Sequence, residues 1–239
     1  MVRPEISLVI PAHNEEESIE ECVREAAGVL DKLDMPYEIL VVDDGSSDGT
    51  FDVLKAVRKD LPQLRALRFK RNRGQSAAMD AGFHHAAGDI VVTMDADLQN
   101  DPADIPKLLE ALKQWDAVCG MRVKRRDSLG KRISSRIANW VRNKLSGENI
   151  RDTGCSLKAY RRECLTKLKL FEGMHRFLPT LLKLAGFTVA EISVNHRPRL
   201  RGRTKYNMWN RVFKSFRDLL AVRWMKRRWI HYEIEEEIE

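Results

Sequence analysis

The sequence DIVVTMDADLQNDP, residues 89–102, decides how the rest of the chain is interpreted. It opens with an apolar run that is typical of a strand buried on both faces. Asp95 and Asp97 follow at a spacing of two residues, which on a strand end directs both carboxylates to the same side. Gln99 adds a third side-chain oxygen, and Pro102 prevents the strand from continuing. Two carboxylates at the end of a buried strand are costly unless a positive charge lies between them.

A divalent cation is the natural candidate for that charge. Carboxylate and amide oxygens suit Mg²⁺ or Mn²⁺, and either ion would keep open positions for the phosphates of a substrate. The alternative is a polar strand end whose Asp97 or Asp101 only caps the helix that follows. The stretch alone leaves both interpretations open.

The composition indicates a folded α/β protein. With 239 residues, 43% apolar and 32% charged, the chain is long enough for one large domain or one domain with an appendage. The first residues run directly into a predicted strand, so we expect no signal peptide. No apolar run approaches the ~18–20 residues of a spanning helix. The four cysteines show no metal-ligand spacing, which indicates buried or incidental thiols in a reducing compartment.

The two halves of the chain differ strongly in charge. Residues 1–120 carry 13 Lys and Arg against 23 Asp and Glu, a balance of −10, whereas residues 121–239 carry 29 against 12, a balance of +17. A basic half beside an acidic, metal-binding half favours an anionic partner: nucleic acid, a phosphorylated substrate or an acidic membrane. A solvated charged surface is the simpler alternative.

The first hundred residues alternate between predicted strands and helices. Strands are expected at 6–10, 37–42, 65–69 and from residue 90, with helices at 18–33, 50–60 and 74–87 between them. This order predicts a mostly parallel sheet with helices on both faces. The polar loops 11–16, 43–50, 72–75 and 95–101 then meet at the carboxyl edge, where ligands bind in such sheets.

The second half predicts further elements and a C-terminal helix. Helices are expected at 104–115, 133–145, 163–168 and 175–184, and strands at 117–120, after the 152–155 turn, and at 187–194. Residues 209–229 combine an apolar face, a basic flank and Trp residues, which is typical of a helix at a membrane surface. A helix packed on the protein is the alternative, and the two are compatible. We therefore divide the chain into a domain of residues 1–206 and an amphipathic appendage of residues 207–239.

The usual nucleotide motifs are absent from the sequence. There is no GxGxxG after the first strand and no GxxxxGK[ST], so a nucleotide would be held differently. Asp43 and Asp44 could accept hydrogen bonds from a base or from ribose hydroxyls, and the backbone around Pro11 and Ala12 could line the base. A plain turn with a helix N-cap explains Asp43 and Asp44 equally well.

Taken together, these pieces resemble family-2 glycosyltransferases of the GT-A (Rossmann-like) fold. The resemblance is greatest to the polyprenyl-phosphate, dolichol-phosphate-mannose-synthase-like branch. The matching segments are VIPAHNEE (9–16), VVDDGSSDGT (41–50), NRGQ (72–75), MDADLQ (94–99), DTGC (152–155) and the basic run 196–205. They follow the order of the family and span residues 5 to 206. Each segment alone is weak evidence, and their combination is specific.

The resemblance implies a role for each matching residue. The residues expected to bind the nucleotide-sugar donor are Pro11, Ala12, Asn14, Glu15, Asp43, Asp44, Gly74, Gln75, Asp95 and Ala96. A Mg²⁺ or Mn²⁺ ion would be held by Asp95, Asp97 and Gln99. Arg122, Arg197, Arg203 and Lys205 would meet the pyrophosphate and the lipid phosphate. The residues expected to take part in catalysis are Asp97, Asp152 and Arg122.

The resemblance also implies a partner and a location. Many relatives carry C-terminal transmembrane helices and this sequence shows none, which favours an amphipathic dock or a separate membrane-spanning partner. We expect a peripheral protein at the cytoplasmic face of the membrane. The donor would be a UDP- or GDP-sugar and the acceptor a polyprenyl phosphate.

The chemistry of such a transfer depends on the acceptor. A metal ion on Asp95 and Asp97 would neutralise the departing diphosphate, with basic residues completing the clamp. A hydroxyl acceptor also needs a general base, for which Asp152 is the candidate, unless Asp152 only caps its turn. A polyprenyl phosphate needs no base because its oxygen is already anionic; it needs cationic residues to hold it in line. In-line attack predicts inversion at the anomeric carbon.

Three other functions compete with this prediction. A family-2 transferase acting on a hydroxyl would make Asp152 essential. A catalytically silent nucleotide-sugar-binding subunit is disfavoured because the Asp95-x-Asp97-x-Gln99 pattern is intact. Nucleic-acid binding is disfavoured because no known module is present and the aromatic residues lie in apolar stripes.

Overall fold

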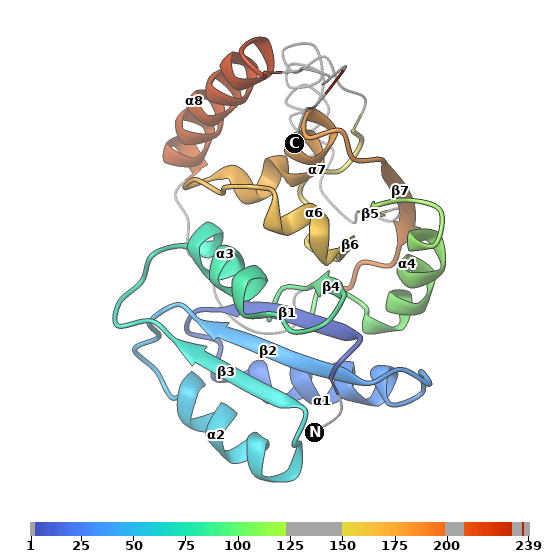
Figure 1. Ribbon diagram of the computed structural model, residues 1–239. Coiled ribbons are helices and arrows are strands. Elements are labelled where there is room, and N and C mark those ends of the chain that lie inside the picture. Colours follow the sequence, from blue (N-terminus) through green and yellow to red (C-terminus); the bar gives the residue numbers. More distant parts are fainter. Residues whose placement is uncertain (1–2, 123–149, 199–207, 231–235, 237–239) are drawn as a thin grey trace.

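The computed structural model describes residues 3–122, 150–198, 208–230 and 236, with the backbone alone for 208–216. Its centre is one seven-stranded sheet in the order β3-β2-β1-β4-β6-β5-β7 (Figure 1). The strands are β1 (Ile6–Ala12), β2 (Tyr37–Asp43), β3 (Leu64–Arg68), β4 (Ile90–Thr93), β5 (Ala117–Arg122), β6 (Lys158–Arg161) and β7 (Val189–Val194). Every neighbouring pair is parallel except the two pairs made by β6. The predicted mostly parallel sheet is confirmed.

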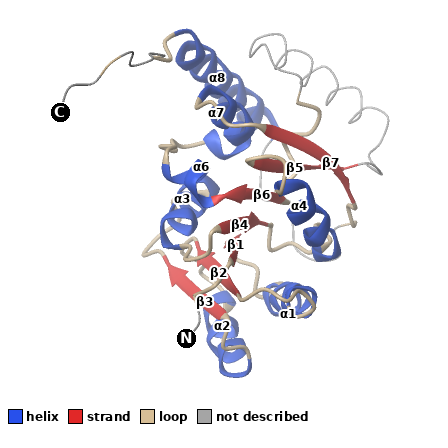
Figure 2. Cartoon of the chain, turned by 45° about the vertical axis from the view of Figure 1, so that its right-hand side comes forward, coloured by secondary structure: helices blue, strands red, loops and turns tan. Residues whose placement is uncertain are grey.

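Helices cover both faces of this sheet. They are α1 (Ile19–Leu30), α2 (Thr50–Asp60), α3 (Gln75–His85), α4 (Ile105–Leu112), α6 (Arg162–Thr166), α7 (Leu178–Leu184) and α8 (Met208–Arg227), with 3₁₀ turns η1 (Pro102–Asp104) and η2 (Met174–Phe177). One buried cluster joins α1, α2 and α4 to the sheet, and a second joins α3, α6, α7 and α8 to its other face. Figure 2 shows α1 and α4 on one side of the strands and α3 and α6 on the other.

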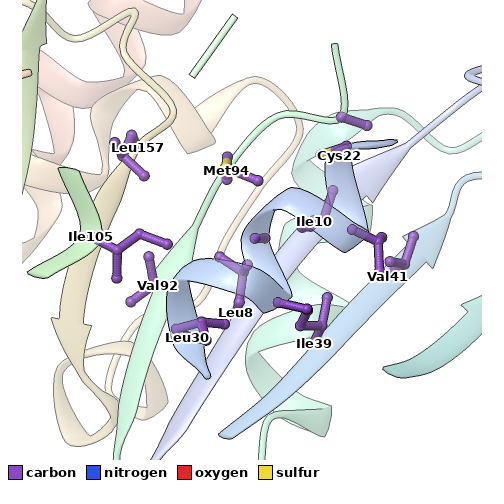
Figure 3. Packing of buried hydrophobic residues seen from close by; sticks show 14 of the residues in the cluster. Leu8, Ile10, Cys22, Leu30, Ile39, Val41, Val92, Met94, Ile105 and Leu157 are labelled. Atoms are coloured by element: carbon purple, nitrogen blue, oxygen red, sulfur yellow. The ribbon is translucent and has the colours of Figure 1, made fainter. Parts of the chain in front are cut away.

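The core explains why the central strands are apolar at consecutive positions. Leu8 and Ile10 of β1 belong to the cluster beneath α1, Leu8 near Leu30 and Ile10 near Cys22 (Figure 3), while Val9 between them belongs to the cluster on the opposite face. Because successive side chains point to opposite faces, a strand covered on both sides must be apolar throughout. Burying each such side chain stabilises the fold by roughly 1.5–3 kcal/mol.

The predicted elements lie within a few residues of the observed ones, with two differences. The helix expected at 104–115 is shorter and follows the turn η1, because the Asp101 side chain accepts a hydrogen bond from the Ala103 N–H at 3.1 Å. The helix expected at 175–184 is divided into η2 and α7, and Pro179 lies in the first turn of α7. The helix predicted at 133–145 lies outside the described residues.

The C-terminal helix α8 has one side on the protein. Leu219 and Val222 are buried in the cluster formed with α3, α6 and α7, whereas Leu220 and Trp224 are 45% and 63% exposed. This helix therefore packs on the protein with one side and exposes apolar and basic residues on another. None of the described helices is both long enough and apolar enough to cross a membrane.

Candidate active site

The site lies at the carboxyl ends of β1, β2 and β4. Ala12 at the end of β1 is paired with Asp43 at the end of β2, and Val9 is paired with Thr93, the last residue of β4. The loops that follow these strands therefore leave the sheet side by side. This is the convergence that the strand order predicted.

The loops after β1 and β2 are tied together by hydrogen bonds. The Asn14 N–H donates to Ser46 Oγ at 2.9 Å, and Asn14 Oδ1 accepts from the Ser47 N–H at 2.8 Å. The Glu15 N–H donates to Thr50 Oγ1 at 2.9 Å. Asn14 adopts a φ of 54°, a left-handed conformation that Asn tolerates better than most residues. Asn14 and Glu15, predicted to contact a nucleoside, thus also fix the turn after β2.

Asp43 is a buried carboxylate with an oxygen that lacks a hydrogen-bond donor. Its Oδ1 accepts from the Ser46 N–H at 2.9 Å, while Oδ2 has no hydrogen bond and lies 3.2 Å from Arg68 Nε. The side chain is fully buried. A hollow of about 350 Å³ adjoins it, lined by Gly45, Ser46, Arg68, Phe69 and Lys70. A buried acceptor beside such a hollow suits an N–H donor of a ligand.

Asp44 has a different environment from Asp43. Both of its oxygens accept backbone hydrogen bonds, Oδ1 from the Arg73 N–H at 2.6 Å and Oδ2 from the Gly74 N–H at 2.8 Å. Gly74 has a φ of +88°, which a residue with a side chain would rarely adopt. Asp44 therefore fixes the turn that begins α3 and with it the position of Gln75.

Asp95 is the centre of the site. Its Oδ1 accepts from Gln75 Nε2 at 2.9 Å. Burial raises the pKa of the Asp95 carboxyl to about 6, and the neighbouring Asp97 carboxylate adds to the rise. A hydrogen bond from the Ser156 side chain and the charges of Lys158 and Arg122 act in the opposite direction and lower it. A positive charge placed between Asp95 and Asp97 would relieve their repulsion.

The donor set at this position fits a hard divalent cation. Asp95 and Asp97 supply carboxylate oxygens and Gln99 follows them with a carboxamide. Across the described part of the chain, no three His, Cys, Asp or Glu side chains are grouped as a metal centre. Gln99 can supply a neutral oxygen beside the two carboxylates.

Asp152 and Arg122 form a close ion pair next to this group. Asp152 Oδ2 accepts from Arg122 Nε at 2.7 Å and Asp152 Oδ1 from Arg122 Nη2 at 2.8 Å. Asp152 also accepts from the Gly154 N–H at 3.1 Å, as the turn-capping alternative expected. The carboxylate of Glu191 accepts from the N–H groups of Arg151 and Asp152 at 3.0 Å. The carboxylate predicted as a base is thus bound to the arginine predicted as a phosphate ligand.

Arg197 is also held by carboxylates. Its Nη1 lies 2.7 Å from Glu25 of α1, its Nη2 lies 2.8 Å from Asp101, and its backbone N–H donates to the Gln99 carbonyl at 2.9 Å. Arg197 therefore ties the segment after β7 to the loop of Asp95 and Asp97. Arg203 and Lys205 lie outside the described residues.

Several residues of the site were missed by the sequence analysis. Lys158 is 2% exposed, and its charge lowers the pKa of Asp95. Lys158 is the first residue of β6 and Arg161 is the last, so the position of Lys158 in the sequence did not reveal its burial, which requires an anionic neighbour. Asn100, Ser156 and Glu191 were not distinguished either, since polar residues in loops and at a sheet edge are ordinary.

Comparisons of the sequence identify the family. A sequence model described as Glycosyl transferase family 2 matches residues 7–169. The dodecaprenyl-phosphate galacturonate synthase of Rhizobium johnstonii is 38% identical over 229 residues, which cover 93% of this chain and 68% of that protein. The undecaprenyl-phosphate 4-deoxy-4-formamido-L-arabinose transferase of Edwardsiella ictaluri is 38% identical over 205 residues, 85% of this chain and 63% of that protein. The chain thus spans about two thirds of the length of these relatives.

Solved structures agree with the fold. A glucosyl-3-phosphoglycerate synthase from Mycobacterium tuberculosis, in complex with Mn²⁺, UDP and glucosyl-3-phosphoglycerate, superposes with a TM-score of 0.71 at 22% identity, covering 93% of this chain and 80% of the other. The mannosyltransferase PcManGT from Pyrobaculum calidifontis, in complex with GDP-Man and Mn²⁺, gives 0.62 at 22% identity, covering 95% and 70%. The predicted GT-A fold is confirmed, and the chain belongs to glycosyl transferase family 2.

Proposed function

We propose that this protein transfers a sugar from a nucleoside-diphosphate sugar to a polyprenyl phosphate, with a divalent cation at Asp95, Asp97 and Gln99. The observation that carries the proposal is the carboxylate pair Asp95 and Asp97, with a raised pKa at Asp95, at the strand ends beside the buried acceptor Asp43. The names of the relatives, a dodecaprenyl-phosphate and an undecaprenyl-phosphate sugar transferase, support the acceptor.

The donor site is built from the loops after β1, β2 and β4. Asp43 Oδ2 is paired with Arg68 Nε at 3.2 Å and would accept an N–H of the base once Arg68 turns away. The segment from Pro11 to Glu15 lines the same rim. Asp44 acts through the backbone of Gly74, which it holds at 2.8 Å. Gln75 donates to Asp95 Oδ1 at 2.9 Å and so helps to orient this carboxylate. Ala96, which lies between Asp95 and Asp97 in the sequence, is buried at 3% exposure and has a small side chain.

The divalent cation would be held by Asp95, Asp97 and Gln99. When bound, it supplies Lewis-acid neutralisation of the diphosphate that leaves the sugar. The basic residues predicted for the phosphates, Arg203 and Lys205, would add positive charge on the acceptor side. Attack in line with the leaving diphosphate inverts the anomeric carbon.

The state of Asp152 favours a phosphate acceptor over a hydroxyl. A general base must hold a lone pair ready for the proton it removes. Both oxygens of Asp152 are engaged by Arg122, at 2.7 and 2.8 Å, which favours the anion and weakens it as a base. A polyprenyl phosphate needs no proton removed. The ion pair can therefore stay intact, with Asp152 orienting Arg122. Transfer to a hydroxyl remains the competing function and would require this pair to open.

The exposed side of α8 suits an acidic membrane surface. Leu220, Trp224 and Ile230 are 45%, 63% and 80% exposed, and the basic residues among them are Arg217, Arg223, Lys226, Arg227 and Arg228. Exposed apolar side chains flanked by Lys and Arg bind anionic lipids peripherally. We place the protein at the cytoplasmic face of the membrane, where a separate membrane-spanning partner can share the lipid substrate.

Sedimentation with vesicles tests this surface. The protein should bind vesicles that contain an anionic phospholipid more than neutral ones, and the variant Trp224→Ser/Leu220→Ser should reduce that binding at least fivefold. Thr188→Val, on the far edge of the sheet, is the matched control. Equal binding to both kinds of vesicle, or no effect of the double variant, would remove the membrane surface from the proposal.

The transfer itself is tested with purified protein, Mn²⁺ or Mg²⁺, a panel of UDP- and GDP-sugars and a short polyprenyl phosphate. We expect lipid-linked sugar from one donor of the panel, and none with Asp97→Ala, whose folding is checked by circular dichroism. A product that forms equally well with Asp97→Ala would refute the assignment of the site.

A further inference from the structure

The regular hydrogen bonding of the sheet ends just before Asp95. The Met94 N–H still donates to the Val9 carbonyl at 3.2 Å, but β4 itself ends at Thr93. The next N–H, that of Asp95, donates to the side chain of Asn100 at 3.0 Å. At Asp95 the acceptor is thus the side chain of Asn100 and no longer the backbone of the neighbouring strand β1.

The chain reverses its direction in the loop between Asp95 and Asn100. Leu98 adopts a φ of 62° and is 6% exposed. A bulky residue in the left-handed region costs roughly 1–3 kcal/mol and persists only where the surroundings hold it. Burial of the Leu98 side chain and closure of the loop by Asn100 provide that support. The reversal of the chain brings the Asn100 side chain to the Asp95 N–H.

Asn100 also joins two other segments of the site. Its Oδ1 accepts a second hydrogen bond, from Ser156 Oγ at 2.8 Å, and Ser156 lies in the turn that follows Asp152. Its backbone forms an antiparallel bridge with His196, and the next N–H, that of Arg197, donates to the Gln99 carbonyl at 2.9 Å. Asn100 is 5% exposed. One buried carboxamide therefore connects the Asp95 loop, the 152–156 turn and the segment after β7.

We infer that Asn100 is a positioning residue, which fixes the main chain of Asp95 so that the Asp95 and Asp97 carboxylates are arranged for a metal-bound nucleoside diphosphate. The inference rests on the proposed function. A carboxamide suits this role because its oxygen accepts two hydrogen bonds without adding a third negative charge beside Asp95 and Asp97. Its loss would leave the Asp95 N–H without its acceptor and would remove one acceptor of the Ser156 hydroxyl.

Calorimetric titration without turnover tests this role. UDP and GDP are each titrated into the protein with and without Mn²⁺, and the measured quantity is the factor by which Mn²⁺ tightens binding. Asn100→Ala and Asn100→Leu, the second close in volume to Asn, should lower that factor at least tenfold while metal-free binding stays within threefold. Asn100→Asp keeps the acceptor oxygen but adds the negative charge that the carboxamide avoids, and should lower the factor by less than tenfold at pH 8.

Two control variants separate this effect from general destabilisation. His84→Ala, at an exposed position near the end of α3, should change the factor less than threefold. Thr188→Val lies far from the site and should not change it. If Mn²⁺ does not tighten the binding of UDP or GDP to the wild type, the proposed function itself fails.

If Mn²⁺ tightens nucleotide binding to the wild type and to Asn100→Ala or Asn100→Leu by the same factor, the inference about Asn100 is overturned. Should neither variant fold, a loss of more than tenfold in Asn100→Asp overturns it as well.

Discussion

Gln75 Nε2 lies 2.9 Å from Asp95 Oδ1, so the first turn of α3 holds the first carboxylate of the pair at the end of β4. The same turn is itself held by Asp44, which accepts from the N–H groups of Arg73 and Gly74. The loop after β2 therefore acts on Asp95 through the short segment from Arg73 to Gln75, which leads from β3 into α3. This relationship leads to the first prediction.

Gln75→Ala should lower kcat/KM for the donor about tenfold, equivalent to ~1.4 kcal/mol, because Asp95 loses the hydrogen bond that orients it. Initial rates measured over a range of Mn²⁺ concentrations should show a higher Mn²⁺ requirement. His84→Ala, near the other end of the same helix, is the control and should behave as the wild type. An unchanged Mn²⁺ requirement in Gln75→Ala would show that the contact does not orient Asp95.

The ion pair of Asp152 and Arg122 leads to one prediction about stability and one about activity. Arg122→Ala leaves a nearly buried carboxylate without its partner and should destabilise the protein by roughly 3 kcal/mol in urea unfolding. Asp152→Asn removes the charge but keeps the shape, and should retain at least a tenth of the transfer to polyprenyl phosphate. Complete loss of transfer in a folded Asp152→Asn protein would instead identify Asp152 as a base.

The start of β7 predicts a pH dependence of stability. The Asp116 carboxylate accepts from Thr188 Oγ1 at 2.6 Å and from the Thr188 N–H at 2.8 Å, and these bonds hold the pKa of Asp116 below its usual value. A carboxyl with a depressed pKa in the folded state stabilises it above the unfolded pKa, and this contribution is lost as pH falls through the folded pKa. Thr188→Val should thus cost about 1 kcal/mol at neutral pH.

That cost should shrink as the pH falls below about 4, where the unfolded carboxyl begins to bind a proton. Urea unfolding of the wild type and of Thr188→Val from pH 3 to 7 measures it. A difference in the free energy of unfolding that stays constant over this range would contradict the assignment.

The four cysteines are predicted to be unreactive in the folded protein. All four are buried, and burial raises the pKa of the Cys119 and Cys155 thiols to about 11 and that of Cys164 to about 12. Burial also raises the pKa of Cys22. Because the thiolate is the reactive form, an aromatic disulfide reagent at pH 8 should label the native protein slowly and label four thiols after denaturation. Rapid labelling of the native protein would indicate that the core opens readily.

The sequence predicted the fold because its signals are local. The apolar runs of β1, β2 and β4 and the turns after them could be located from neighbouring residues, and the parallel order then placed Asp43 and Asp95 at one edge. The partners of the polar side chains could not be predicted in this way. Arg197 pairs with Glu25, 172 positions away in the chain, and such a contact depends on how two faces of the sheet are covered.

The same limit applies to Asp44 and Asn100. Their side-chain oxygens bind backbone N–H groups, those of Arg73 and Gly74 and that of Asp95, and no spacing in the sequence distinguishes this use from ligand binding. The pattern of Asp95, Asp97 and Gln99 that predicts a metal site was visible because it lies within five consecutive residues.

The most direct test of the account compares two acceptors of equal chain length, a polyprenyl phosphate and the corresponding polyprenol, with the active nucleotide-sugar and Mn²⁺. Lipid-linked sugar should form with the phosphate at least a hundred times faster than with the alcohol, because only the phosphate brings an oxygen that needs no base. Comparable transfer to the polyprenol, lost in Asp152→Asn, would contradict the account and identify a transferase that acts on hydroxyl groups.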